Sequence, residues 1–162
     1  MEHVFWLLPD RLAGRAGPNR RPWELAAIRA LGIGAVLSVN DGAGCDPSEF
    51  SALGLIYRCV PLPPNEPPIE GDEELCRLAL PPAHEFVLAQ HAAGRAVLVH
   101  CSAGKDRTGL YMSYFLMREQ GLGMEAAIAR VREVRPIALS AAGWEAMARR
   151  VLARPVSGTL GA

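Results

Sequence analysis

A ten-residue segment of this chain, HCSAGKDRTG, contains the side chains that are best suited to chemistry. It runs from His100 to Gly109, directly after the apolar residues AVLV, and it includes Cys101 and Arg107. A cysteine six residues before an arginine is weak as a motif, because the chain has four cysteines and 16 arginines. The surrounding pattern is more informative, since a buried strand enters the segment, a glycine lies within it and a helix follows it.

This pattern predicts a cradle for an anion. A loop that curls into a helix N-terminus points successive backbone N–H groups inward, and the helix dipole adds positive potential there. Arg107 can present a bidentate fork to two phosphate oxygens. The same positive field favours the thiolate of Cys101, which would be a nucleophile aimed at the phosphorus of a bound phosphate ester.

The flanking elements indicate how the segment is positioned. Strands are predicted at 4–8, 35–39, 55–60 and 96–100, and helices at 22–31, 47–54, 72–93, 108–120, 124–134 and 140–152. Strands that alternate with helices indicate an α/β fold with a mainly parallel central sheet flanked by helices. Ligands bind beyond the carboxyl ends of such strands, which is where the HCSAGKDRTG segment lies.

Prolines interrupt this pattern in two places. The run PLPPNEPP at 61–68 excludes both a helix and a central strand, and it predicts a loop that is either stiff and ordered or mobile. Pro81 and Pro82 fall inside the helix predicted at 72–93, and we expect them to kink that helix or to split it in two.

Length and composition limit the classes of protein that need to be considered. The 162 residues, half of them apolar, fit one domain, which we place at 1–154 with a frayed tail at 155–162. The 17 basic and 17 acidic side chains give a formal charge of zero, which argues against nucleic acid as a partner. No transmembrane run, signal peptide or C-x-x-C pair is apparent, so the expected location is cytoplasmic.

Two sets of side chains outside the segment are interpreted as surface features. His84 and His91 lie seven residues apart on the helix interrupted by prolines, and no third metal ligand is in register with them. Arg130, Arg132 and Arg135 are expected to form a solvated helical face, with substrate docking as the alternative.

Residues 100–109 resemble the signature loop of the cysteine-based protein tyrosine phosphatases, H-C-x-x-G-x-x-R-[S/T]-G. Residues 8–14 and 31–37 are similar to the opening of small atypical dual-specificity phosphatases, and VREVRP at 131–136 resembles an element that follows their catalytic helix. The resemblance implies a dual-specificity phosphatase-like fold. It also implies hydrolysis of phosphate monoesters without a metal or other cofactor.

The resemblance assigns a role to each residue of the loop. Cys101 would attack phosphorus and form a cysteinyl-phosphate, which water would then hydrolyse. Thr108 resembles the hydroxyl that donates a hydrogen bond to the cysteine sulfur, and His100 resembles the residue that supports the loop from behind. The substrate phosphate would be held by Ser102, Ala103, Gly104, Lys105, Asp106 and Arg107.

The general acid departs from the family pattern. Pro64 stands where the family places an aspartate, so another carboxyl group must protonate the leaving oxygen. Asp106 precedes the arginine, as in bacterial and lipid-directed members of the superfamily, and Glu66 is the nearest carboxylate in the proline-rich loop. We favour Asp106 and keep Glu66 as the alternative. In a further departure, Ser140 and Ala141 replace a Pro-Asn pair of related enzymes.

Several functions remain open at this point. The leading hypothesis is a phosphatase of the protein tyrosine or dual-specificity type, acting on a phosphorylated protein. Lys105, the only lysine of the chain, favours a multiply phosphorylated substrate, so a phosphoinositide phosphatase is the alternative. The missing aspartate allows a non-catalytic phosphate-binding pseudophosphatase. Rhodanese and arsenate reductase chemistry fits the segment poorly, and the glycine spacing excludes a P-loop nucleotide site.

Overall fold

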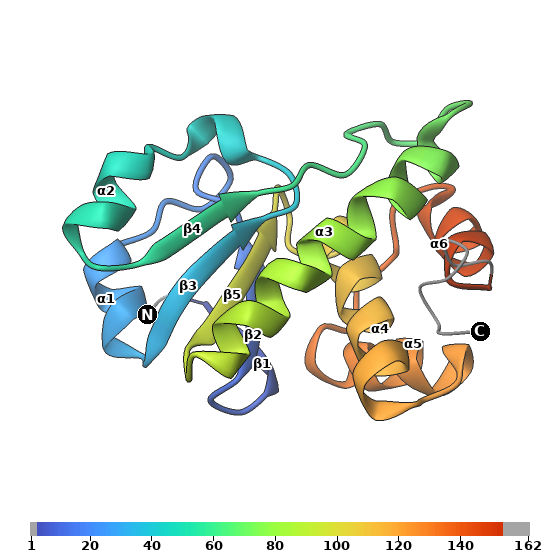
Figure 1. Ribbon diagram of the computed structural model, residues 1–162. Coiled ribbons are helices and arrows are strands. Elements are labelled where there is room, and N and C mark those ends of the chain that lie inside the picture. Colours follow the sequence, from blue (N-terminus) through green and yellow to red (C-terminus); the bar gives the residue numbers. More distant parts are fainter. Residues whose placement is uncertain (1–2, 154–162) are drawn as a thin grey trace.

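A five-stranded sheet separates the helices into two groups (Figure 1). The structure is a computed structural model and describes residues 3–153. The strands are β1 (Phe5–Leu8), β2 (Leu12–Ala16), β3 (Ile33–Ser38), β4 (Ile56–Cys59) and β5 (Ala96–Cys101). The helices are α1 (Leu25–Ala30), α2 (Pro47–Ala52), α3 (Asp72–Ala92), α4 (Arg107–Gln120), α5 (Met124–Val134) and α6 (Trp144–Ala153), with a short 3-10 helix at Gly42–Gly44. The tail predicted at 155–162 lies outside the described residues, and so does residue 154.

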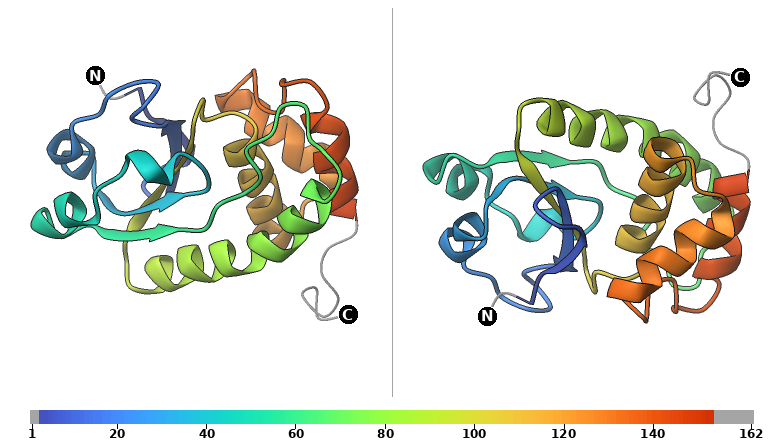
Figure 2. Two further views of the ribbon diagram at one scale, coloured as in Figure 1. Left: turned by 90° about the horizontal axis from the view of Figure 1, so that it is seen from above. Right: turned by 90° about the horizontal axis from the view of Figure 1, so that it is seen from below.

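The sheet has the order β1-β2-β5-β3-β4, and only β1 runs antiparallel to its neighbour. This arrangement confirms the predicted α/β class with a mainly parallel sheet. All six residues of β5 are buried, because helices cover both faces of the sheet. Helices α1 and α2 cover one face, and α3 to α6 cover the other (Figure 2). Within residues 3–153, no helix is both long and apolar enough to cross a membrane.

The structure adds one strand that the sequence pattern did not predict, β2. The turn before it carries Asp10 in a left-handed conformation with φ of 62°, and it returns the chain antiparallel to β1. The strand lacks a recognisable run of apolar residues, because it contains a glycine and a charged residue, Arg15. Arg15 is nevertheless only 1% exposed. Gly14 is required there because a Cβ atom would lie 2.5 Å from the ring of Phe5.

Helix α1 is shorter than predicted, and it begins at Leu25 rather than at Pro22. The guanidinium group of Arg15 explains the difference. Its Nη1 donates to the carbonyl of Arg21 at 2.9 Å, and its Nη2 donates to the carbonyl of Pro22 at 3.2 Å. These carbonyls are therefore held toward the sheet and do not enter the first helical turn.

Helix α3 is a single helix of 21 residues that contains Pro81 and Pro82, so of the two predicted alternatives, a kink or a split, the split is excluded. A proline removes one N–H donor from a helix, and each substitution of this kind costs about 3 kcal/mol. Tertiary packing offsets that cost, because one face of α3 is buried on the core throughout its length. The buried apolar residues of that face are Cys76, Leu80, Ala83, Phe86 and Val87.

His84 is part of the core and not of the surface, which corrects the prediction. It is 4% exposed and accepts or donates one hydrogen bond on each ring nitrogen. Its Nδ1 lies 3.0 Å from Tyr111 Oη, and its Nε2 lies 2.8 Å from Glu119 Oε2. The position of His84, four residues after Leu80 on the buried face of α3, was the signal in the sequence.

Burial of histidines makes the stability of this protein dependent on pH. Desolvation lowers the pKa of His100 to about 4 and also lowers the pKa of His84. In the unfolded chain the histidines become protonated near pH 6.5. Below that pH the unfolded chain therefore binds more protons than the folded chain. The free energy of unfolding should therefore fall as the pH drops from 6.5 to 4, by about 3 kcal/mol for His100 alone.

Urea denaturation at a series of pH values measures this effect. The His100→Asn variant should show a shallower decline over the same range, since it lacks the contribution of His100. A free energy of unfolding that stays constant between pH 7.5 and pH 5 would contradict the prediction.

Candidate active site

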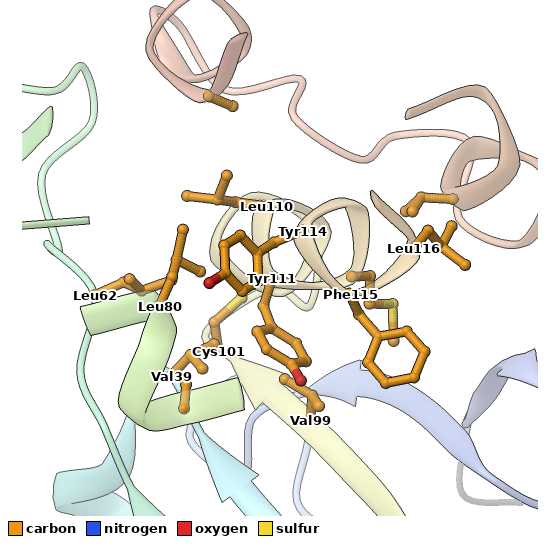
Figure 3. Packing of buried hydrophobic residues seen from close by; sticks show 14 of the residues in the cluster. Val39, Leu62, Leu80, Val99, Cys101, Leu110, Tyr111, Tyr114, Phe115 and Leu116 are labelled. Atoms are coloured by element: carbon orange, nitrogen blue, oxygen red, sulfur yellow. The ribbon is translucent and has the colours of Figure 1, made fainter. Parts of the chain in front are cut away.

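The loop that connects β5 to α4 lies at the carboxyl edge of the sheet, as predicted. Cys101 is the last residue of β5 and is 1% exposed, and Arg107 is the first residue of α4. The cysteine side chain lies between the sheet and α4, near Val39 and Leu80 (Figure 3). Thr108 Oγ1 donates a hydrogen bond to Cys101 Sγ at 3.2 Å. A hydroxyl in this position can stabilise negative charge on the sulfur.

His100 points to the opposite face of the sheet, because neighbouring residues of a strand alternate. Its Nε2 lies 2.5 Å from Ser38 Oγ, and its Nδ1 lies 3.2 Å from the carbonyl of Cys101. The ring of Trp23 packs edge-on against the imidazole, with centroids 4.9 Å apart. His100 thus lies behind the loop, in the position that the family resemblance implies.

Glycine is required in the middle of the loop. Gly104 has φ of 68°, in the left-handed region where a side chain is strained. A Cβ atom there would also come within 2.6 Å of the carbonyl group of Arg15 in β2. The segment that follows β2 also contacts the loop, because Gly17 donates its N–H to the carbonyl of Ser102 at 2.9 Å. The loop therefore packs directly on the chain that follows β2.

The loop leaves a row of backbone donors unused. Among residues 3–153, the six consecutive N–H groups from Ser102 to Arg107 donate to no protein acceptor. Buried or crowded N–H groups are normally paired, so a run of six is unusual. These donors also lie at the N-terminus of α4, where the helix dipole adds positive potential. The arrangement is suited to binding an anion with several oxygens.

Arg107 contacts the proline-rich loop in this conformation. Its Nε donates to the carbonyl of Pro63 at 2.8 Å, and its Nη1 donates to Glu66 Oε2 at 3.0 Å. Its Nη2 lies 3.5 Å from the carbonyl of Asn65, and its guanidinium carbon lies 4.5 Å from the centroid of the Trp144 ring. Three of its five N–H groups are thus engaged, and an arriving phosphate competes with Glu66 for this side chain.

The loop at 61–68 is ordered rather than mobile. Trp144 Nε1 donates to the carbonyl of Asn65 at 2.9 Å, and Asn65 Nδ2 donates to Asp72 Oδ2 at 3.0 Å. Leu62 donates its N–H to the carbonyl of Val39 at 2.8 Å, which ties the loop to the end of β3. Sequence reasoning missed Trp144, although an aromatic residue after Ala-Gly at the start of the last helix was a signal.

Asp106 and Lys105 connect the loop to the segment before α6. Asp106 is 1% exposed, and its Oδ1 accepts a hydrogen bond from the N–H of Ala141 at 3.1 Å. Its Oδ2 lies 3.2 Å from Lys105 Nζ, but the angles do not form a hydrogen bond, and no other described residue donates to it. Lys105 Nζ donates to Ser140 Oγ at 3.2 Å. These contacts join the two segments although the Pro-Asn pair of related enzymes is replaced here.

Arg135 supports the loop from outside, so it is not a solvated residue. Its Nη2 donates to the carbonyl of Ala103 at 2.7 Å, and its Nε donates to the carbonyl of Gly104 at 3.2 Å. Arg130 and Arg132 also donate to backbone carbonyls, those of Leu7 and Ala138. The predicted solvated face is therefore wrong for all three arginines, because their long side chains fold back onto neighbouring elements.

The two candidate acids have different surroundings. The Glu66 side chain is 48% exposed and forms an ion pair with Arg107. Asp106 is buried within the loop itself and forms an ion pair with Lys105, and its Oδ2 accepts no hydrogen bond from residues 3–153. Among residues 3–153, no group of three or more metal-ligating side chains is close enough to hold a metal ion.

The chain is similar to known proteins in its sequence and in its fold. Residues 27–148 match the family model described as "Dual specificity phosphatase, catalytic domain". The chain is 34% identical over 133 residues to phosphatidylglycerophosphate phosphatase PTPMT1 of Arabidopsis thaliana, covering 78% of this chain and 36% of that protein. It is 32% identical over 143 residues to dual specificity protein phosphatase 12 of Mus musculus, covering 88% of this chain and 39% of that protein. The chain thus spans less than half the length of these curated relatives.

The fold has a close counterpart among solved structures. Tk-PTP in its active form superposes with a TM-score of 0.72 at 23% sequence identity, covering 94% of this chain and 97% of that one. At that identity the likeness concerns the fold. The family match covers most of the chain, and it includes the whole Cys101–Arg107 loop. The chain therefore belongs to the dual specificity phosphatase catalytic domain family, within the cysteine-based protein tyrosine phosphatase superfamily.

Proposed function

We propose that this chain hydrolyses phosphate monoesters through a cysteinyl-phosphate intermediate. The observation that carries the proposal is the row of six unused N–H donors between Ser102 and Arg107, directly after Cys101. A phosphate group bound by those donors places its phosphorus in front of the cysteine sulfur. The C-x5-R loop therefore supplies both the binding site and the nucleophile.

The reaction follows in two steps. The Cys101 thiolate attacks phosphorus, the S–P bond forms, and the P–O bond to the leaving group breaks while that oxygen takes a proton from a general acid. Water then attacks phosphorus and gives a proton to the deprotonated general acid, the S–P bond breaks, and inorganic phosphate leaves. The hydrogen bond from Thr108 Oγ1 to the sulfur stabilises the thiolate that departs in the second step.

Arg107 binds the equatorial oxygens of the phosphate in this proposal. The charge of the arriving phosphate exceeds that of one carboxylate, so it can draw the guanidinium fork away from Glu66. The contact from Arg107 to the Pro63 carbonyl holds the side chain near the loop in the meantime. Glu66 is then a competitor of the phosphate for Arg107.

We assign the general acid to Asp106. Its Oδ1 already accepts a hydrogen bond from Ala141, while its Oδ2 accepts none from the described residues and is the atom that would carry the proton. The Asp106→Asn variant keeps the shape and the acceptor oxygen but cannot release a proton. We expect kcat on an alkyl phosphate to fall by about 10²–10⁴-fold. The loss on an aryl phosphate should be smaller, because its leaving group needs less protonation.

The Glu66→Gln variant is the matched comparison for this test. It breaks the ion pair with Arg107 and should lower KM, because phosphate no longer competes with a carboxylate. Its kcat on the alkyl phosphate should stay within a few-fold of the parent. If Asp106→Asn leaves alkyl turnover unchanged, or if Glu66→Gln shows the larger loss in kcat, the assignment to Asp106 is wrong.

Two classes of substrate come into consideration for this site. The names of the curated relatives include a dual specificity protein phosphatase and a phosphatidylglycerophosphate phosphatase, so both proteins and lipids occur as substrate classes among them. We propose a phosphorylated protein as the general class, with a phosphoinositide as the second candidate because Lys105 adds a cation to the loop. A thiolate nucleophile needs a reducing setting, which the cytoplasm provides.

A further inference from the structure

A cavity of about 320 Å³ lies beside the phosphate-binding loop. Ala103 and Lys105 of the loop form one wall, Arg135 forms another, and Arg20 and Arg21 of the segment between β2 and α1 form a third. Among the residues that the structure describes, no aspartate or glutamate lines it. Four positive side chains thus surround one small cavity, in a chain whose total charge is zero.

Among residues 3–153, three of the four charges of this cavity have no carboxylate partner, whereas Lys105 forms an ion pair with the buried Asp106 at 3.2 Å. Within residues 3–153, neither Arg20 nor Arg21 forms an ion pair, and Arg135 donates only to carbonyl groups. Arg21 and Arg135 are close enough to repel each other, since Arg21 adds to the lowering of the Arg135 pKa that burial causes. Like charges held together in this way are stabilised by a bound anion.

The segment that carries the two arginines is held in place. Its Gly17 N–H donates to the carbonyl of Ser102 in the loop, and the buried guanidinium of Arg15 donates to the carbonyl of Arg21 at 2.9 Å. Asn19 Nδ2 donates to Asp41 Oδ1 at 2.6 Å, which ties the segment to the end of β3. An anion site on this segment would therefore be preorganised, and binding would cost little ordering of the chain.

The cavity and the reaction site share one wall. Ala103 and Lys105 line the cavity and belong to the loop that would bind the reacting phosphate. Arg135, which forms another wall, donates to the carbonyls of Ala103 and Gly104 in the loop that follows Cys101. A substrate with two phosphate groups can therefore place one of them in front of Cys101 and the other in the cavity.

We propose that this cavity binds a second phosphate group of the substrate, which selects the second of the two substrate candidates, a compact polyphosphorylated headgroup such as that of a phosphoinositide. The proposal rests on the proposed function. A phosphate ester carries about 1.5 to 2 negative charges and accepts the planar forks of two arginines, whereas a peptide carboxylate carries one charge on a flexible side chain. Four cations around a small rigid cavity match the phosphate better.

The double variant Arg20→Ala/Arg21→Ala tests the proposal. Both side chains are exposed, and the backbone carbonyl of Arg21 that Arg15 binds remains, so the fold should tolerate the change. We expect kcat/KM on a soluble short-chain phosphatidylinositol bisphosphate to fall by about 10–100-fold, because charge-assisted hydrogen bonds to the second phosphate are lost. Turnover of an aryl phosphate, which has no second anion, should stay within twofold.

The Arg29→Ala variant is the matched control, since it removes an exposed arginine of α1 that does not line the cavity. It should leave both activities unchanged. Isothermal titration of the Cys101→Ser protein with inositol 1,4-bisphosphate and with inositol 1-phosphate gives a second readout that needs no turnover. The bisphosphate should bind about tenfold more tightly, and the double substitution in Arg20 and Arg21 should abolish that difference.

The outcomes separate the two proposals. If the parent protein does not hydrolyse the aryl phosphate, the proposed function fails, and the titration alone decides whether the cavity binds a second phosphate. If the parent protein is active but the double variant affects both substrates equally, or affects neither, the cavity is not a second-phosphate site. A selective loss on an acidic phosphotyrosine peptide, with no loss on the bisphosphate, would overturn the assignment to a headgroup.

Discussion

Replacement of Cys101 by serine is expected to lower kcat on an aryl phosphate by about 10⁴-fold or more. The serine hydroxyl keeps the shape of the site and the hydrogen bond from Thr108, but it is not ionised near neutral pH. Loss of a covalent nucleophile removes a reaction path rather than one stabilising contact, so the effect should be among the largest in the protein. Release of inorganic phosphate under reducing conditions is the measurement.

Cys59→Ser is the matched control for this prediction, because Cys59 is an exposed cysteine at the end of β4. It should retain full activity. Turnover in Cys101→Ser close to that of the parent protein would contradict the proposed mechanism. A parent protein that binds phosphate but shows no turnover at all would instead favour the non-catalytic pseudophosphatase.

Replacement of Arg107 by lysine should have the second largest effect, a fall in kcat/KM of about 10³-fold. Lysine keeps the positive charge but loses the planar fork that matches two phosphate oxygens. Removal of one donor to a developing charge typically costs 10²–10³-fold, and Arg107 supplies at least two. The measurement is kcat/KM on the same aryl phosphate.

The alternative explanation for such a loss is a disturbed proline-rich loop, since Arg107 also holds Pro63 and Glu66. Glu66→Gln separates the two explanations, because it breaks the ion pair but keeps the guanidinium group. If Glu66→Gln and Arg107→Lys lose the same activity, the arginine acts mainly by anchoring the loop. A much smaller effect of Glu66→Gln supports direct binding of phosphate.

Local sequence patterns were sufficient to predict the two elements on either side of the loop. The buried strand before Cys101 and the helix after Arg107 were predicted within one residue. An apolar run and a helical repeat are short-range properties that any window of the sequence displays. The strand β2 was missed because Gly14 and Arg15 interrupt its pattern, and both residues are explained only by contacts with other elements.

The effect of two prolines and the burial of one histidine depend on tertiary contacts for a related reason. Pro81 and Pro82 weaken an isolated helix, but the buried face of α3 outweighs their cost. His84 reads as a polar surface residue until Tyr111 and Glu119 are placed beside it. In each case contacts between residues far apart in the sequence supply the stabilising free energy. Such contacts leave no periodic pattern in the sequence.

The sequence by itself was enough to predict the chemistry that we propose for this chain. The order of cysteine, glycine, arginine and threonine in one loop is enough to predict an anion cradle with a nucleophile, because the loop is short and its backbone is governed by local rules. Only the tertiary structure decided what surrounds that loop. It placed Glu66 on Arg107, Asp106 against Ala141, and two arginines of a distant segment beside the cavity. Those encounters depend on how the sheet and helices pack, so the residues involved lie 35 or more positions apart, or on different elements altogether.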